Sequence, residues 1–300
     1  MKKLIYRHTS CSVLITLLLL LCACSTEKTN EQQTASITIE DDLGRKIQLP
    51  HQPQRVLALA SSMTEMLFAV CDTASIVGRT QNCDYPAAAL SKPVVNNYPV
   101  DMERVLQLKP DLIFTTEGIT PLEVAARLEE LGVPVYYQKY RTVEDIFSGL
   151  EDIGRIVGRE QQAKQVADSL RQEVAQIEAR HKNKEQPLKV LAVVNYDPIY
   201  VYGHSTVISD KLRILGAENA VEETYEAMSR EAILKSNPDV LLGGTPEEME
   251  KNFFSIYPEL RKIKAYQNKR IYKPTADLMS RATPRVVASI KELERFLYPS

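Results

Sequence analysis

The sequence predicts an α/β fold made of two lobes of similar plan that are joined by one long helix. Three observations carry this prediction. The segment MERVLQLKPDLIF at 102–114 returns as REAILKSNPDVLL at 230–242, without a gap and at a constant offset of 128 (230 minus 102). An apolar stretch at 55–60 likewise returns at 189–194. Between the two halves, residues 159–183 contain neither proline nor glycine and repeat apolar side chains at helical spacing.

Each copy of the repeated segment is predicted to form a short helix that ends at a Pro-Asp pair and leads into a strand. Asp101 and Ser229 are good helix N-caps, which places Glu103 and Glu231 in the first helical turn. The proline ends each helix because it lacks an amide hydrogen, and the continuous apolar run behind it is typical of a strand buried on both faces. A chance similarity between two common helix–strand units is the alternative to a duplicated architecture.

The other elements follow from periodicity along the chain. A turn at 42–45 between alternating residues predicts a β-hairpin over 37–49. The helix at 159–183, with about 22 residues and a length of roughly 33 Å, would reach from one lobe to the other. We also expect, in chain order, a strand at 55–60, a helix at 62–70, a short strand at 75–78, a loop at 81–86, a helix at 122–131, a strand at 133–137, a helix at 143–157, a strand at 270–273, and a helix that starts at Pro284 with Thr283 as its cap.

The N-terminus is predicted to be a signal peptide over residues 1–23. Lys2, Lys3 and Arg7 form a positive region, and the apolar run at 13–21 is too short for a comfortable membrane span. The following Leu-Cys-Ala-Cys resembles a bacterial lipoprotein signal, which implies cleavage before Cys24 and a lipid on its sulfur. An ordinary secretory signal with incidental cysteines is the alternative. The predicted organisation is then a lipidated tether at 24–36, an N-terminal lobe at 37–158, the linking helix at 159–183 and a C-terminal lobe at 184–300.

Composition and motifs argue against several classes of function. A net charge of −2 gives no basic surface for nucleic acid. Past the signal peptide, His51, His181 and His204 are widely spaced, so no metal site is expected. The sequence has no nucleotide-binding glycine motif, no phosphate loop and no nucleophile elbow. We therefore expect no enzyme and no cofactor, and a lobed hydrolase or reductase is the alternative from another class. Cys71 and Cys83 are not expected to form a disulfide.

Several motifs together resemble one protein family. The lipoprotein signal, the opening at 41–59, the unit at 102–114 and the helix-joined lobes resemble helix-linked (class III) substrate-binding proteins of bacterial ABC importers, over nearly all of 37–300. Within that family, four local motifs resemble members that bind vitamin B12. These motifs are CDYP at 83–86, VNNYPVDMER at 95–104, SREAILKSNPD at 229–239 and DLMSRATPRVV at 277–287.

The resemblance implies two Rossmann-like lobes with a ligand cleft between them, and cobalamin or a related corrinoid as the transported ligand. It also implies a monomer that is held to a membrane of the cell envelope by its lipid and delivers the ligand to a permease dimer. Glu103 and Glu231 match acidic residues that dock on the permease. The residues that match ligand-contacting positions are Tyr85, Tyr98, Tyr200, Tyr225, Asp277 and Arg281. The absence of tryptophan departs from the family pattern, in which tryptophans line the cleft.

The residue types suit such a ligand. A corrinoid is a flat macrocycle with an apolar body and an amide-bearing rim, and tyrosine offers both an aromatic face and a hydroxyl. The six residues are predicted on loops, most of them just after strands, where ligands bind in open α/β sheets. The alternatives are tyrosines that cap the cores, a surface ion pair between Asp277 and Arg281, and glutamates that only complement a helix dipole. Haem or an iron siderophore is the rival ligand, and a contact of His204 with cobalt is a further alternative.

Overall fold

The computed structural model describes residues 36–182, 186–222 and 227–299. Residues 36–300 form one compact unit. The predicted signal peptide, Cys24 and Tyr225 lie outside the described residues. In the part of the chain that is described, no helix is long and apolar enough to cross a membrane. Cys71 and Cys83 are both free thiols.

The N-terminal lobe is built on a parallel sheet with the strand order β3-β6-β7. It is preceded by the predicted antiparallel hairpin of β1 (Ile37–Glu40) and β2 (Lys46–Leu49). The sheet strands are β3 (Val56–Ala58), β6 (Leu112–Thr116) and β7 (Val135–Gln138), and a separate parallel pair joins β4 (Arg79–Thr80) to β5 (Val94–Val95). The helices are α2 (Ser61–Val70), α3 (Met102–Leu108), α4 (Leu122–Glu130) and α5 (Val143–Val157), with short 3₁₀ turns η1 (Thr73–Ser75) and η2 (Ala87–Ser91).

One predicted strand in this lobe is wrong. Residues 75–78 do not form a strand: Thr73–Ser75 make a 3₁₀ turn, and Ile76 contributes only an isolated bridge to Val56. Pairing starts at Arg79, the first residue of β4. The apolar residues in this segment are buried against the core rather than paired along a ladder, and periodicity alone does not separate these two cases.

The C-terminal lobe carries a second sheet with the order β10-β8-β11-β12, in which neighbouring strands are parallel. The short strand β9 adds antiparallel to β8. The strands are β8 (Lys189–Asn195), β9 (Tyr200–Val201), β10 (Glu218–Asn219), β11 (Val240–Leu242) and β12 (Ile271–Tyr272). The helices are α7 (Val207–Ile214), α8 (Arg230–Ser236), α9 (Pro246–Met249), η3 (Glu250–Phe254), η4 (Pro258–Lys262), α10 (Lys264–Gln267), α11 (Ala276–Ser280) and α12 (Val286–Leu297).

The duplicated unit is confirmed at its helices. α3 and α8 each have 7 residues, and the side chains of their N-caps Asp101 and Ser229 accept a backbone N–H of the first turn. Both helices end in a left-handed residue just before the proline, Lys109 with φ 47° and Asn237 with φ 45°. This conformation is unusual outside glycine. Its presence at the same point of both units therefore supports a shared architecture.

The duplication extends to the first strands. The carboxylate of Asp111 accepts the backbone N–H of Arg55 at 2.9 Å, and that of Asp239 accepts the N–H of Lys189 at the same distance. Each aspartate therefore fixes the register between β3 and β6, or between β8 and β11. The strand pairs match accordingly, with Val56 opposite Leu112 and Val190 opposite Val240.

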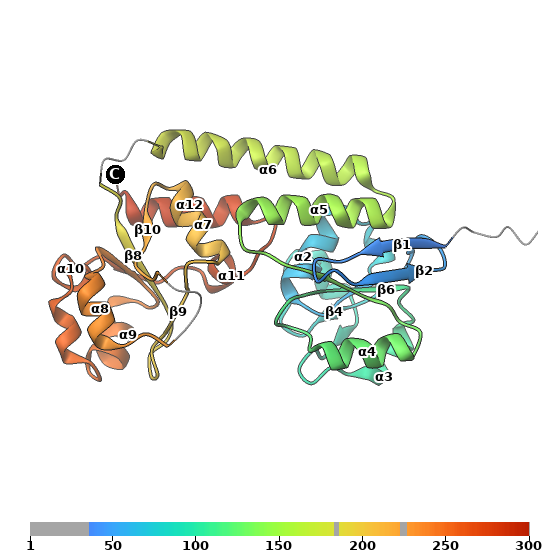
Figure 1. Ribbon diagram of the computed structural model, residues 1–300, viewed down its shortest axis with the longest axis horizontal. Coiled ribbons are helices and arrows are strands. Elements are labelled where there is room, and N and C mark those ends of the chain that lie inside the picture. Colours follow the sequence, from blue (N-terminus) through green and yellow to red (C-terminus); the bar gives the residue numbers. More distant parts are fainter. Residues whose placement is uncertain (1–35, 183–185, 223–226, 300) are drawn as a thin grey trace, which may run out of the picture. The chain divides into compact units, whose positions relative to one another are not determined.

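The linking helix is confirmed as α6 (Glu160–His181), with 22 residues. It lies along α5 and continues toward α12 (Figure 1). Arg171 pairs with Glu151 on α5 at 2.6 Å, and Arg180 pairs with Glu294 on α12 at 3.0 Å. The helix α6 therefore contacts a helix of each lobe, α5 in the N-terminal lobe and α12 in the C-terminal lobe. The boundaries of the lobes at 158 and 184 stay predictions.

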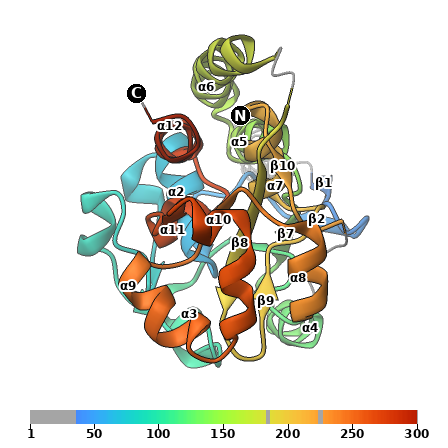
Figure 2. The ribbon, with the colours of Figure 1, turned by 90° about the vertical axis from the view of Figure 1, so that its left-hand side faces the viewer.

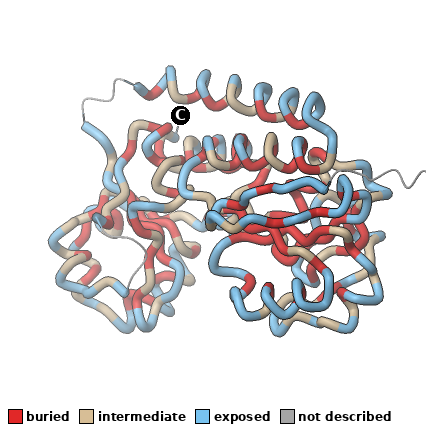
Figure 3. Tube along the Cα trace, turned by 45° about the vertical axis from the view of Figure 1, so that its right-hand side comes forward, coloured by how far each residue is buried: buried red, intermediate tan, exposed pale blue. Residues whose placement is uncertain are grey.

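Burial shows how the two sheets are covered. Alternate residues of β3 enter different cores: Val56 and Ala58 join a core that also contains α6 and α12, whereas Leu57 joins a core confined to the N-terminal lobe. β8 behaves in the same way, with Val190 in the shared core and Leu191 in a core of the C-terminal lobe. Figure 3 shows buried segments where strands and helices meet. In the second sheet, α7 and α12 pack on one face and α8 to α10 on the other (Figure 2).

Candidate functional site

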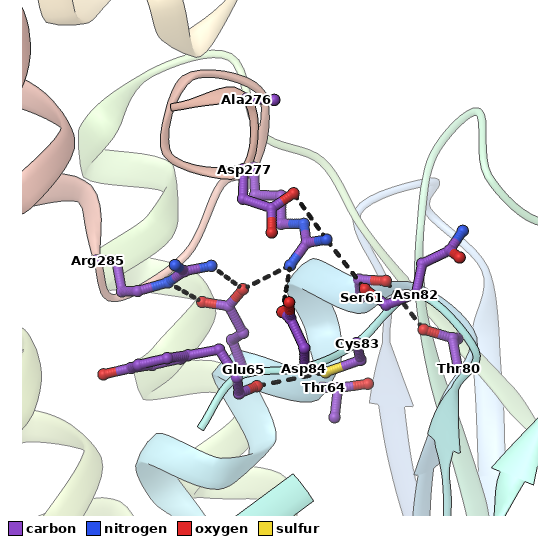
Figure 4. A network of polar contacts seen from close by, with 12 residues as sticks. Ser61, Thr64, Glu65, Thr80, Asn82, Cys83, Asp84, Ala276, Asp277 and Arg285 are labelled. Atoms are coloured by element: carbon purple, nitrogen blue, oxygen red, sulfur yellow. Dashed lines mark hydrogen bonds and ion pairs between the residues drawn. The ribbon is translucent and has the colours of Figure 1, made fainter. Parts of the chain in front are cut away.

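Arg281, which follows α11, makes contacts that join the C-terminal lobe to α2 and to the loop at 81–86. Figure 4 shows Glu65 on α2 between Arg285 and the loop residue Asp84. The guanidinium of Arg281 lies 2.8 Å from the carboxylate of Asp277 and 3.8 Å from that of Asp84. It also donates to the carbonyl oxygen of Asn82 at 3.0 Å and to Glu65 at 3.2 Å. The predicted pair of Asp277 and Arg281 is therefore present, but it is part of a larger network. We call it the Glu65 network, and it comprises Glu65, Asn82, Asp84, Tyr85, Asp277, Arg281 and Arg285.

Glu65 is the centre of this network, and the sequence analysis missed it. It lies on α2 and is only 3% exposed. Arg285 donates two hydrogen bonds to the carboxylate of Glu65, from Nε at 2.7 Å and from a terminal nitrogen at 2.5 Å. The hydrogen bond with Glu65 raises the pKa of Arg285 further, against the opposing effect of burial. An acid among buried apolar residues of a helix, here between Met63 and Met66, is the signal that could have found it.

Tyr85 is the aromatic member of the network. Its ring lies 4.4 Å from the guanidinium carbon of Arg285, in a cation–π contact, and the residue is 46% exposed. The backbone before it is held by Arg79, which donates to the carbonyl oxygens of Thr80 at 3.1 Å and Cys83 at 2.9 Å. The thiol of Cys83 is buried, which raises its pKa, and it donates to the carbonyl of Tyr85. The cysteine is therefore part of the support for this loop.

Two expectations about the C-terminal segment are corrected. Asp277 does not lie on a loop but in the first turn of the short helix α11. The last helix, α12, begins at Val286 rather than at Pro284. Thr283 accepts the backbone N–H of Arg285 through its hydroxyl at 3.2 Å. This turn precedes α12 and directs the Arg285 side chain toward Glu65.

Tyr98 and Tyr200 are not members of the Glu65 network. Tyr98 is 84% exposed on the loop between β5 and α3. Tyr200 is half-buried in β9, where it bridges to Ala227. Since Tyr225 lies outside the described residues, the structure brings together three of the six predicted ligand residues. These are Tyr85, Asp277 and Arg281.

Glu103 and Glu231 occupy equivalent, exposed places in the first turns of α3 and α8. Glu103 accepts a hydrogen bond from Gln107 at 3.1 Å. The pKa of Glu231 is lowered, first by its own backbone N–H and then by Ser229. Both acids are therefore exposed groups at the positive end of a helix dipole.

A separate cavity of about 1370 Å³ lies beside α7 and β10. His204, Arg141 and Asp210 are among its lining residues, and none of the predicted ligand residues that the structure describes lines it. Among the described residues, no group of histidine, cysteine, aspartate and glutamate could hold a metal ion. His204 lines this cavity and is not a member of the Glu65 network.

Comparison with known proteins agrees with this architecture. The Periplasmic binding protein family matches residues 56–278. The chain belongs to this family. A substrate-binding lipoprotein of an ABC transporter from Bacillus subtilis, YvrC, which is itself uncharacterized, is 27% identical over 271 residues, which cover 88% of this chain and 86% of the relative. A vitamin B12-binding protein from Yersinia pestis is 27% identical over 251 residues, which cover 82% and 87%.

Two solved structures extend this result. A possible iron-binding, periplasmic solute-binding protein from Staphylococcus epidermidis has a TM-score of 0.74 and 28% identity, and the match covers 82% of this chain and 99% of that one. A periplasmic heme-binding protein from Pseudomonas aeruginosa has a TM-score of 0.72 and 25% identity, with 83% and 94% covered. This periplasmic binding protein is thus the extracytoplasmic substrate-binding component of an ABC importer, and it is not an enzyme.

Proposed function

We propose that this protein binds cobalamin or a closely related corrinoid and delivers it to the importer's permease. The observation that carries the proposal is the exposed ring of Tyr85, backed by Arg285 and placed beside Asp277 and Arg281 in one network. A tyrosine fixed in this way offers a rigid aromatic face to a flat macrocycle. Asp277, whose side chain is 35% exposed, can accept hydrogen bonds from amide groups on the rim of a corrinoid.

The proposed site extends beyond the Glu65 network. Tyr98, with most of its surface free of protein contacts, supplies a second aromatic wall, and Tyr200 and Tyr225 supply further walls from the C-terminal lobe. The ligand itself brings the metal, so the protein needs no resident cofactor. The vitamin B12-binding relatives and the motifs CDYP and DLMSRATPRVV support the corrinoid over other ligands of the class.

Delivery and anchoring complete the proposal. Glu103 and Glu231 place one exposed carboxylate on each lobe, at equivalent helix ends, and charges paired in this way fix the orientation of a partner. We assign them to the contact with the two halves of the permease. Cys24 carries the lipid that holds the monomeric protein on the outer side of a membrane, as the B. subtilis lipoprotein relative suggests.

The test is direct binding by the protein without its lipid anchor, residues 25–300. Cyanocobalamin, haem and a ferric siderophore are each mixed with the protein and separated by gel filtration, with visible absorbance as the readout. We expect cyanocobalamin to co-elute near one to one. The double variant Asp277→Ala/Arg281→Ala should lose this co-elution. Co-elution of haem or the siderophore alone would assign the site to that ligand instead.

A further inference from the structure

The short helix α11 carries Asp277 and leads directly into Arg281, so its position sets the geometry of both residues. α11 has only 5 residues, and so short a helix is not stable without tertiary contacts. Met279 anchors its apolar side in the shared core, with 8% exposure. The ends of the helix are therefore the places where its orientation is decided.

The N-terminal end of α11 is held by an acid. Glu292 on α12 accepts the backbone N–H of Thr275 at 3.1 Å and the hydroxyl of Thr275 at 2.7 Å. Thr275 is the residue just before the helix, and a carboxylate at this end complements the free N–H groups and the positive end of the helix dipole. Glu292 thus ties the start of α11 to the middle of α12.

The C-terminal end of α11 is held by a buried cation. Lys211 on α7 is 0% exposed, and its ammonium donates to the carbonyl oxygen of Leu278 at 2.9 Å and to that of Met279 at 3.2 Å. These carbonyls belong to the last turn of α11, where a cation complements the negative end of the dipole. A fully buried lysine is rare because its desolvation is costly. The proposed ligand contacts of Asp277 and Arg281 do not by themselves explain why this lysine is buried.

We propose that Lys211 and Glu292 are positioning residues that clamp α11 at its two ends and thereby set the ligand affinity of Asp277 and Arg281. This inference rests on the ligand site proposed above. Asp277 and Arg281 face each other one helical turn apart, and Arg281 must also reach Asn82 and Glu65 on the other lobe. A small rotation of α11 would separate Arg281 from these partners, and the clamp prevents it.

The protonation of Lys211 gives the clamp a distinctive signature. Burial lowers the pKa of Lys211 to about 7, and the charge of Glu292 opposes this decrease. The other charged groups near Lys211 pair with residues other than this lysine. Asp210 accepts the backbone N–H of Val143 and pairs with Arg213, which also reaches Glu178 on α6.

The remaining charges face other partners. On α11, Asp277 pairs with Arg281. On α12, Glu294 pairs with Arg180 of α6, and Lys291 pairs with Glu173.

Below a pH of about 7 the ammonium of Lys211 is charged and binds the carbonyls of Leu278 and Met279 most strongly, since charge-assisted hydrogen bonds are roughly twice as strong as neutral ones.

Ligand affinity and protein stability should therefore respond to pH in opposite directions. Above pH 7 the neutral amine of Lys211 forms weaker hydrogen bonds with the carbonyls of α11, so the affinity for the ligand falls. The unfolded chain, with an ordinary lysine, binds more protons than the folded chain between pH 7 and the usual lysine range. Stability consequently rises with pH across this window. A lysine that merely fills space in the core would change stability without changing affinity.

The experiment compares the wild type with Lys211→Met, and with Lys251→Met as an exposed lysine control. Cyanocobalamin affinity is measured at pH 6 and pH 8.5. We expect wild-type affinity to fall by roughly threefold to tenfold over this range, as for loss of a charge-assisted hydrogen bond. In Lys211→Met we expect weak binding with no such fall and a melting temperature at or above that of the wild type, because a buried charge has been removed. Wild-type affinity in Lys211→Met would overturn the inference.

A readout without ligand separates this inference from the proposed function. Hydrogen exchange of the amides of Met279 in α11 and of Arg281 just after it should accelerate in Lys211→Met and in Glu292→Gln but not in Lys251→Met. If wild-type protein binds no cyanocobalamin, the proposed ligand is wrong, and the exchange result still decides the clamp. Unchanged exchange in both clamp variants would refute it. Glu292→Gln also provides the test if Lys211→Met fails to fold.

Discussion

The first helices of the two lobes, α2 and α7, invite comparison because each follows a first strand that belongs to the duplicated plan. Each buries one charged side chain, Glu65 at 3% exposure and Lys211 at 0%. Both charges act on the same segment from opposite sides. Glu65 binds the arginines after α11, and Lys211 binds its last carbonyls. The two helices differ in what they link, since Glu65 joins the lobes whereas Lys211 acts within one.

This difference shows where the two lobes have diverged. The repeated helix, the Pro-Asp pair and the strand that follows are alike in both lobes, and they build the framework. The segments between the first strand and the repeated helix are not alike: β3 leads directly to α2, whereas β8 is followed by β9 before α7. Glu65, Asn82, Asp84 and Tyr85 lie in the N-terminal one of these segments, and the other members of the network follow β12. A duplicated framework therefore supports a site that has no internal symmetry.

The largest expected effect comes from breaking the link between lobes. Glu65→Ala leaves Arg281 and Arg285, whose side chains are 14% and 19% exposed, without their buried partner. Loss of one partner of a buried ion pair costs about 3–5 kcal/mol of unfolding free energy. Urea unfolding measures it, with the exposed Glu103→Ala as the matched control. A loss below about 0.5 kcal/mol, the range of ordinary surface substitutions, would show that the lobes do not depend on this link.

A smaller effect sharpens the comparison of the two repeated units. Asp111 accepts two backbone N–H groups, from Gln54 at 2.8 Å and Arg55 at 2.9 Å. Asp239 accepts one backbone N–H, from Lys189, together with the ammonium of Lys264 at 3.1 Å. We expect Asp111→Ala to cost roughly 1–3 kcal/mol, because it leaves both N–H groups without a partner.

The matched variant in the second unit is Asp239→Ala. It should cost less than Asp111→Ala, since Lys264 is half exposed and regains water when its partner is lost. Thermal and urea unfolding of both variants provide the measurement. An equal or larger loss for Asp239→Ala would contradict the difference inferred between the two units.

The smallest effect on stability, and the most specific effect on function, concerns the surface glutamates of the repeat. Glu103→Ala with Glu231→Ala should leave the melting temperature and cyanocobalamin binding unchanged, because both side chains are exposed and outside the Glu65 network. Ligand uptake by cells and association with the permease should fall more than for either single change. Reversal of both charges to lysine should be worse, as like charges would then face each other. If cells with the double alanine variant take up the ligand as well as the wild type does, Glu103 and Glu231 have no docking role and act only as acids in the first turns of their helices.

Much of the framework could be predicted from the sequence because it depends on local rules. The linking helix, the hairpin and the repeated units follow from apolar periodicity, caps and proline, which act within a few residues. The short strand at 75–78 was wrong for the same reason, since a few apolar residues fit a strand and a buried turn equally well. The motif at 277–287 indicated Asp277 and Arg281, although not the helix α11 that carries Asp277.

The duplicated plan, the long connecting helix and the chemical groups that a ligand site would use can all be predicted from the sequence alone. Which of these groups meet depends on the packing of the folded chain. Arg281 and Arg285 reach Glu65 across 216 and 220 residues of chain, and Lys211 reaches the end of α11 across 67. No periodicity encodes such pairings, because they arise where separate helices pack on a common core. The high cost of burying a charge without a partner then fixes each pair in place.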